Sequence, residues 1–191
     1  MNDLDKRIRR TSIINGTILG AILLVLNIIS FYIITSIASS NFMVVIGSKI
    51  FSLLIPIIVA MLFCFFTRKK IGGYWTFKQA TTGIFIMFLI AYSIHLIGND
   101  IVFEKFIEPN YVQRILNADV SAKVSIMKQR GDSQKNIDSA LADLKKDFAQ
   151  DKHITIWNVI MEIMVTLIFL FLFSLIFSLL LKNAEYVSVV D

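Results

Sequence analysis

The stretch from Thr11 to Ser48 contains no Lys, Arg, Asp or Glu. A helix needs only about 20 apolar residues to cross the hydrocarbon core of a bilayer. Across the whole chain of 191 residues, 56% are hydrophobic and only 17% are charged. A soluble domain of this size could not bury so much apolar surface. These values argue against a soluble enzyme, a disordered chain and a disulfide scaffold, and they predict an integral membrane protein.

Four segments are long and apolar enough to span a membrane. The spans are predicted over about 12–36, 49–66, 78–101 and 156–181. The expected fold class is therefore all-α, an integral membrane four-helix bundle, with residues 1–191 forming a single membrane domain. The basic start of the first segment is typical of a signal peptide. Its apolar stretch exceeds the roughly 7–15 residues of such peptides, so we expect it to be retained.

The distribution of basic residues predicts the orientation of the chain. The first ten residues carry four Lys or Arg, and the second connection carries Arg68, Lys69 and Lys70, whereas the first connection carries none. Basic short flanks stay in the cytoplasm. We therefore expect a multi-pass protein of the bacterial inner membrane with both termini cytoplasmic. The net charge of +5 indicates contact with the lipid bilayer rather than with nucleic acid.

Residues 105–154 form the one polar region large enough to have structure of its own. Helical periodicity predicts one helix from about Pro109 to a C-terminal cap at Gly131, and a second helix capped by Asp132 or Ser133. Together they predict an extracytoplasmic helical hairpin inserted between spans three and four. It could pack on itself, on the membrane surface or on a partner, so the segment 108–150 is a candidate surface for a protein partner or a homo-oligomer.

Small and polar residues mark helix faces that pack on protein rather than on lipid. Gly16, Gly20 and Asn27 share one face of the first span, and Gly83 belongs to a stripe of small residues on the third. Small residues allow helices to approach closely in lipid, either within one chain or between two copies. Pro56 removes one backbone hydrogen bond, to the carbonyl of Ser52, and predicts a kink in the second span. That kink could be static or act as a hinge.

Two ionisable side chains fall inside the predicted spans. His95 and Glu162 each lie about six residues from the outer end of their helices, or roughly 9 Å deep at 1.5 Å per residue. Intramembrane ionisable groups usually need a partner. We expect His95 and Glu162 to pair, with Asn99 and Asn158 as hydrogen-bond partners. The pair could clamp two helices together, or it could relay protons or form part of an ion site.

Residues near the ends of the spans have simpler interpretations. Trp75, Trp157, Tyr74 and Tyr111 are expected in the aromatic belts at the membrane surface. Asp100 and Glu104 are expected to be solvated at the interface. Thr76 and Gln79 have the spacing of a capping box at the start of the third span.

Two stretches resemble a known family. These are "GGYWTFKQA" (residues 72–80) and "FIEPNYVQRIL" (residues 106–116), which flank the third span. Together with the four-span layout, they are similar to the domain-of-unknown-function family 4199, small membrane proteins typical of Bacteroidetes-type bacteria. The resemblance covers about residues 8–183. It implies a helical inner-membrane protein without assigned activity, and it supplies no catalytic residues. Independently of the family, "GGYWTFKQA" could anchor the third span or form a cytoplasmic partner-binding loop.

The sequence contains none of the usual motifs of enzymes or metal sites. Phosphate-binding loops, Ser-His-Asp spacing and His-Glu-x-x-His are absent, and Cys64 is the single cysteine. We therefore predict no catalytic residues, no metal and no cofactor. The favoured function is a non-enzymatic membrane interaction or scaffold protein that acts through the hairpin. The alternative is a small transport or ion-handling subunit that uses His95 and Glu162.

Overall fold

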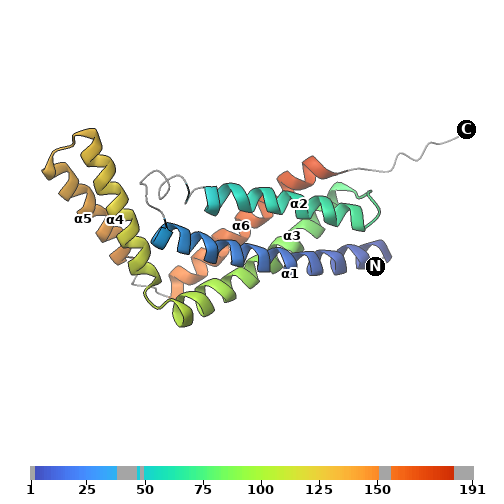
Figure 1. The fold of residues 1–191 in the computed structure, drawn as a ribbon. Helices are drawn as coiled ribbons and strands as arrows, with labels where there is room; N and C mark the ends of the chain where they lie inside the picture. Colours follow the sequence, from blue (N-terminus) through green and yellow to red (C-terminus); the bar gives the residue numbers. More distant parts are fainter. Residues whose placement is uncertain (1–2, 38–46, 48–49, 151–155, 183–191) are drawn as a thin grey trace, which may run out of the picture. The chain divides into compact units, whose positions relative to one another are not determined.

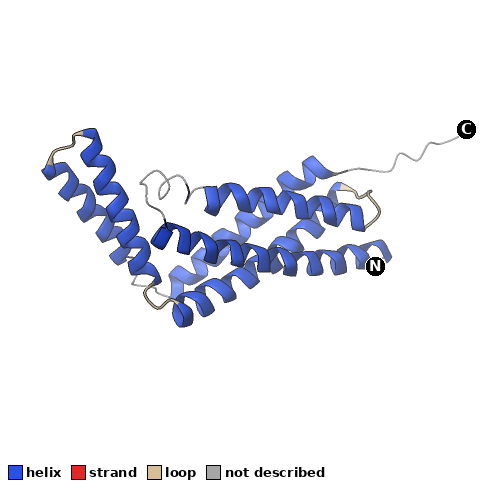
Figure 2. Cartoon of the chain, viewed as in Figure 1, coloured by secondary structure: helices blue, strands red, loops and turns tan. Residues whose placement is uncertain are grey.

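The structure, a computed structural model, describes residues 3–37, 47, 50–150 and 156–182 (Figure 1). All regular secondary structure in this part of the chain is helical, with no strand (Figure 2). Four of its helices are long and apolar enough to cross a membrane. The predicted fold class, an all-α protein with four membrane-type helices, is confirmed. Residues 151–154 of the predicted insertion and the start of the second span at Lys49 lie outside the described residues.

The helical segments are longer than the sequence predicts at several ends. The four membrane-type segments are α1 (Asp3–Tyr32) continued by π-helical Ile33–Ile37, π-helical Ile50–Leu54 followed by α2 (Ile55–Lys70), α3 (Phe77–His95) continued by π-helical Leu96–Ile107, and α6 (Ile156–Leu181). Between the last two lie α4 (Tyr111–Arg130) and α5 (Gln134–Gln150). The third segment therefore runs to Ile107 rather than ending near residue 101, because the helix widens and continues.

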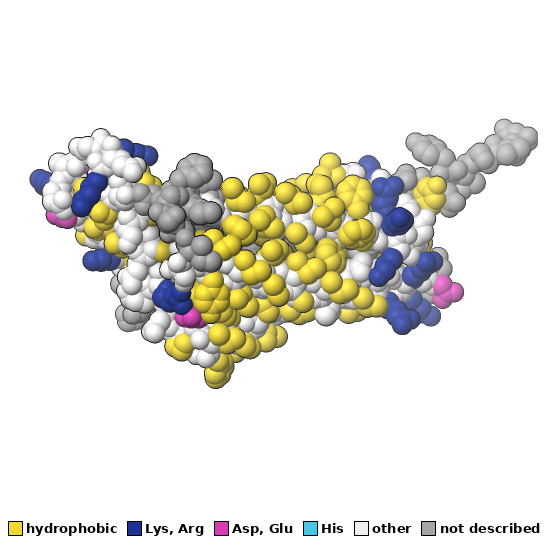
Figure 3. All heavy atoms as spheres, in the orientation of Figure 1, with side chains coloured by type: hydrophobic (Ala, Val, Ile, Leu, Met, Phe, Trp, Pro, Cys, Tyr) yellow, Lys and Arg dark blue, Asp and Glu magenta, His cyan; other side chains and the backbone are white. Residues whose placement is uncertain are grey.

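The chain divides into two compact units. Unit 1 contains Met1–Leu24, Pro56–Ile97 and Met161–Asp191, and unit 2 contains Val25–Ile55 and Gly98–Ile160. Unit 1 thus takes most of α2, α3 and α6 with the first part of α1. Unit 2 takes the end of α1 with α4 and α5. The surface of the long helices is covered by apolar side chains (Figure 3).

Close helix packing in unit 1 depends on glycines. A Cβ atom added at Gly16 would lie 2.6 Å from the carbonyl oxygen of Met87, and one at Gly20 would lie 2.8 Å from that of Ala91. A Cβ at Gly83 would lie 2.9 Å from Ile8. Because these distances leave no room for a side chain, α1 and α3 can touch through their backbones. Gly16, Gly20 and Gly83 therefore lie at the close contact between α1 and α3.

The start of α3 is fixed by two interactions. Thr76 and Gln79 form the predicted capping box, in which the Thr76 hydroxyl accepts from the Gln79 backbone and the Gln79 side chain accepts from the Thr76 backbone. Trp75 corrects the sequence interpretation, because it is only 2% exposed and its indole Nε1 donates to the Leu181 carbonyl at 2.9 Å. It therefore joins the core of unit 1 instead of an aromatic belt. Trp157, in contrast, is 64% exposed.

Pro56 lies at a change of helix type. It is the second residue of α2, and only Ile55 separates it from the π-helical turn Ile50–Leu54. Because helical residues also precede Pro56, its missing N–H leaves one backbone hydrogen bond of the span unmade. Pro56 therefore lies where the π-helical turn passes into α2, inside the continuous helical span Ile50–Lys70, and the kink stays a prediction.

In unit 2, α4 and α5 form a helical hairpin. Gly131 ends α4 in the left-handed conformation, with φ of 77°, as the sequence predicts. Ser133 caps α5 by accepting from the Asn136 backbone. Pro109 precedes α4 in a turn instead of entering its first turn. The short connection leaves α4 and α5 side by side (Figure 1).

Candidate functional site

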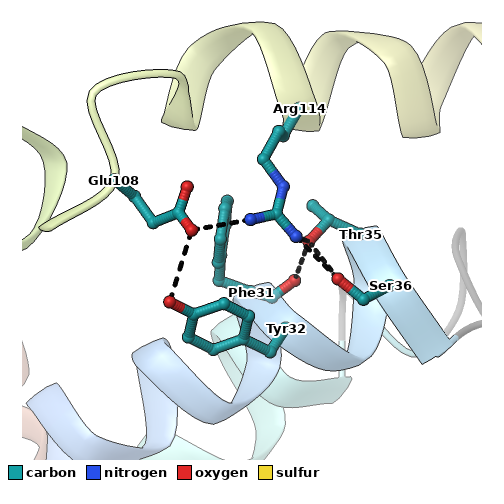
Figure 4. A network of polar contacts seen from close by, with 6 residues as sticks. All are labelled: Phe31, Tyr32, Thr35, Ser36, Glu108 and Arg114. Atoms are coloured by element: carbon teal, nitrogen blue, oxygen red, sulfur yellow. Dashed lines mark hydrogen bonds and ion pairs between the residues drawn. The ribbon is translucent and has the colours of Figure 1, made fainter.

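The base of the hairpin is held by the guanidinium of Arg114. One guanidinium nitrogen lies 2.7 Å from the Glu108 carboxylate, and the other donates to the hydroxyls of Ser36 at 2.6 Å and Thr35 at 3.1 Å. Tyr32 donates to the same Glu108 carboxylate at 3.4 Å. Figure 4 shows Arg114 reaching from α4 to the end of the first long helix. A single side chain therefore joins α4, the turn before it and the segment that follows α1.

An aromatic cluster lies beneath this guanidinium. Arg114 Cζ lies 4.9 Å from the centre of the Phe31 ring and 5.6 Å from that of Tyr32. Phe31 stacks on Tyr111 at 4.7 Å, and Phe103 meets both rings edge to face. Cation–π and aromatic contacts strengthen when water is excluded. The cluster, here called the Arg114 clamp together with the polar contacts of Arg114, therefore joins the base of the hairpin to the end of α1 within unit 2.

Tyr111 is neutral in this clamp. Burial raises the pKa of Tyr111 to about 12, and the nearby carboxylates of Glu104 and Asp100 act in the same direction. Both effects disfavour a phenolate, which would add negative charge to a partly dry and acidic environment. Tyr111 thus contributes a rigid ring to the clamp, and its protonation does not change near neutral pH.

A second polar cluster lies along the π-helical segment Leu96–Ile107. Asn99 is 4% exposed, and its amide nitrogen donates to Glu104 at 2.7 Å and to Asp100 at 2.9 Å. A π-helix pairs residues five apart, which brings Asn99 and Glu104 together. Glu104 is half-buried, so the expectation that it is a solvated interface residue is wrong. The side-chain carbonyl oxygen of Asn99, Oδ1, is buried and has no hydrogen-bond partner in the described part of the chain.

The hairpin also carries an open groove between its two helices. It has a volume of about 460 Å³, with apolar walls and charged side chains of both signs at its edges. The lining residues are Asp119, Lys123, Ile126, Met127, Arg130, Asp132, Ala140 and Leu144. Lys123 donates across the groove to the Ala140 carbonyl at 3.2 Å. Burial raises the pKa of Asp119 above its usual value. This mixture of apolar and charged side chains is typical of protein recognition surfaces.

The predicted intramembrane cluster is distributed over both units. His95 and Glu162 belong to unit 1, and Asn99 and Asn158 belong to unit 2. His95 is half-buried, whereas Glu162 is exposed on α6. The third segment continues twelve residues beyond His95. By residue counting, the depth of His95 in its helix therefore no longer matches the depth of Glu162. The pairing of His95 and Glu162 stays a prediction. Asn27 is half-buried on α1.

Sequence reasoning did not find the Arg114 clamp, although part of the signal was present. Glu108, Tyr111 and Arg114 all lie in the motif "FIEPNYVQRIL". Their partners Phe31 and Thr35, however, lie more than 70 residues earlier, and neither belongs to a recognisable motif. Among the residues that the structure describes, no group of three or more His, Cys, Asp or Glu is placed to hold a metal ion.

These features define a class, that of helical proteins with four membrane-type helices and a polar helical hairpin between the last two. The chain belongs to the family described as "Protein of unknown function (DUF4199)", whose profile matches residues 14–183. The match includes both stretches that carry the sequence resemblance. No curated protein and no solved structure matches the chain.

Proposed function

We propose that this protein is a non-enzymatic, multi-pass protein of the bacterial inner membrane that recruits a partner protein through the α4–α5 hairpin. The observation that carries the proposal is the Arg114 clamp. Arg114 commits its two terminal guanidinium nitrogens to Glu108, Thr35 and Ser36. Such a fixed base lowers the entropy lost when a partner binds.

The hairpin groove supports the same proposal from its chemistry. Met127, Ile126 and Leu144 offer an apolar contact of adaptable shape, and methionine is common at surfaces that accept several partners. Lys123, Arg130 and Asp119 at the edges would select a partner of complementary charge. The expected occupant is a protein segment with apolar side chains flanked by charges.

The proposed orientation places the hairpin outside the cytoplasm and both termini inside it. It is supported by the basic flanks of α1 and α2, because short basic connections are retained in the cytoplasm. Cys64 is fully buried, so cysteines introduced elsewhere can be labelled against a silent background. Gln129, near the end of α4, and Tyr74, between α2 and α3, are both exposed.

We expect Gln129→Cys to react with a membrane-impermeant maleimide in right-side-out vesicles. Tyr74→Cys is expected to react only in inside-out vesicles, because it lies at the opposite, basic end of the spans. The measurement is the labelled fraction of each variant, with the unaltered protein as the blank. Labelling of Gln129→Cys in inside-out vesicles alone would contradict the proposed orientation.

Partner binding is tested by photo-crosslinking from defined positions in the native membrane. A photoreactive amino acid is placed at one of two groove positions, Met127 on α4 or Leu144 on α5. The matched control positions are Gln129 on α4 and Ala142 on α5, each on the face of its helix opposite to the groove. We expect one discrete adduct from both groove positions, at least fivefold stronger than from the two opposite positions. An adduct of twice the chain mass identifies the partner as a second copy. Equal crosslinking from all four positions, or none from the groove, would overturn the proposal.

A further inference from the structure

A second groove lies in unit 1, between α1 and α2. It has a volume of about 440 Å³ and is lined by Asn15, Ile18, Phe63, Phe66, Lys69 and Lys70. This volume falls in the range of roughly 300–1,000 Å³ that is typical of small-molecule sites. The groove therefore has an apolar wall along the membrane-type helices and two ammonium groups at one end.

A buried hydrogen bond joins the two helices beside the groove. Asn15 donates to the Thr67 hydroxyl at 2.7 Å, and that hydroxyl donates in turn to the Phe63 carbonyl at 2.7 Å. Both Asn15 and Thr67 are buried. This bond joins α1 directly to α2, the two helices that form the groove, next to the lining residue Asn15.

The basic end of the groove is reinforced from α1. Arg7 donates to the Lys70 carbonyl at 2.8 Å, which brings the start of α1 against the end of α2. Nearby carboxylates have partners of their own, since Asp3 pairs with Lys6 and Asp5 accepts from Gln79. In Figure 3, Lys and Arg side chains gather at this end of unit 1, next to the apolar surface.

We infer that this groove binds one anionic phospholipid. Lys69 and Lys70 would contact the headgroup phosphate, and an acyl chain would lie along Ile18, Phe63 and Phe66. Basic clusters beside membrane helices attract anionic lipids, and a lysine ammonium binds phosphate as a compact point charge. A zwitterionic lipid would fill the apolar part equally well, but it would carry no net charge to match the basic end. The phosphate and the apolar wall act together, so a free phosphate ion would gain only part of the interaction.

The test is native mass spectrometry of the detergent-solubilised full chain with added phosphatidylglycerol or phosphatidylcholine. We expect one phosphatidylglycerol to remain bound, at least fivefold more than phosphatidylcholine. Lys69→Ala with Lys70→Ala removes the headgroup contact and is expected to abolish that preference. Both side chains are exposed, so the fold should survive. Lys145→Ala with Lys146→Ala, an exposed adjacent pair on α5, removes the same charge away from the groove and should leave the preference intact.

A second variant tests the apolar wall without changing the charge. Ile18→Trp fills the groove from the exposed side of α1 and is expected to lower phosphatidylglycerol binding at least fivefold. Equal retention of the two lipids, or equal loss in the two double-lysine variants, would overturn the inference in favour of diffuse charge attraction. Displacement of the lipid by millimolar inorganic phosphate would overturn it in favour of a simple anion site.

Discussion

Replacing both Gly16 and Gly20 with alanine is expected to destabilise the helical bundle more than any other pair of single-methyl additions. The two new Cβ atoms would lie 2.6 Å and 2.8 Å from the carbonyl oxygens of Met87 and Ala91. Those atoms belong to the backbone of α3, so relief requires the whole helix to move. Overpacking of one site costs about 1–3 kcal/mol. We expect the double variant to lower the free energy of unfolding by roughly 3 kcal/mol, measured by unfolding in mixed detergent micelles.

A matched control is available on the same helix. Ala21 is adjacent to Gly20 but exposed, so Ala21→Leu adds more volume on the outside of α1. Exposed substitutions usually change stability by less than about 0.5 kcal/mol. If Ala21→Leu destabilises the protein as much as the glycine variants do, close packing of α1 on α3 is not what the glycines provide.

Replacing Arg114 with alanine is expected to release the base of the hairpin. The change removes the Glu108 ion pair, two hydrogen bonds to Thr35 and Ser36, and the contact with Phe31. Glu108, whose side chain is 18% exposed, would keep only its contact with Tyr32. Hydrogen bonds to charged groups contribute about 1.5–3 kcal/mol. We expect amide hydrogen exchange in the first two turns of α4 to become at least tenfold faster.

The chemistry of the clamp distinguishes arginine from lysine. A lysine ammonium cannot contact Glu108, Thr35 and Ser36 with the fixed geometry of a planar guanidinium. Arg114→Lys should therefore recover only part of the protection. Lys128→Ala, which removes an exposed charge near the other end of α4, should leave exchange at the base unchanged. Unchanged exchange in Arg114→Ala would show that the aromatic cluster alone holds the hairpin.

Local patterns in the sequence predict the helices and several of their ends. The four apolar segments could be recognised because spanning helices need long runs without charge. The capping box of Thr76 and Gln79 and the cap at Gly131 involve residues within a few positions of one another. Such short-range patterns can be recognised in the sequence because the backbone geometry of a few neighbouring residues determines where a helix begins or ends.

Contacts between distant segments could not be predicted in the same way. Trp75 resembles an interfacial tryptophan by position, but the Leu181 carbonyl, 106 residues later, makes it a core residue. Arg114 likewise finds Thr35 and Ser36 almost 80 residues away. The extension of the third segment to Ile107 could not be predicted, because its π-helical continuation contains the charged residues Asp100, Glu104 and Lys105. A span predicted from a run of uncharged residues ends before them.

The hydrogen bond from Trp75 to Leu181 has a consequence for biogenesis. Trp75 is synthesised long before α6, so its indole donor and the surrounding surface of α3 lack their final partners until the last helix inserts. Phe85 and Phe88 likewise lack their edge-to-face contacts with Phe171 and Phe177 until α6 is present. Insertion of α6 therefore completes the packing of this face of α3, and a chain that ends before α6 leaves Trp75, Phe85 and Phe88 without these contacts.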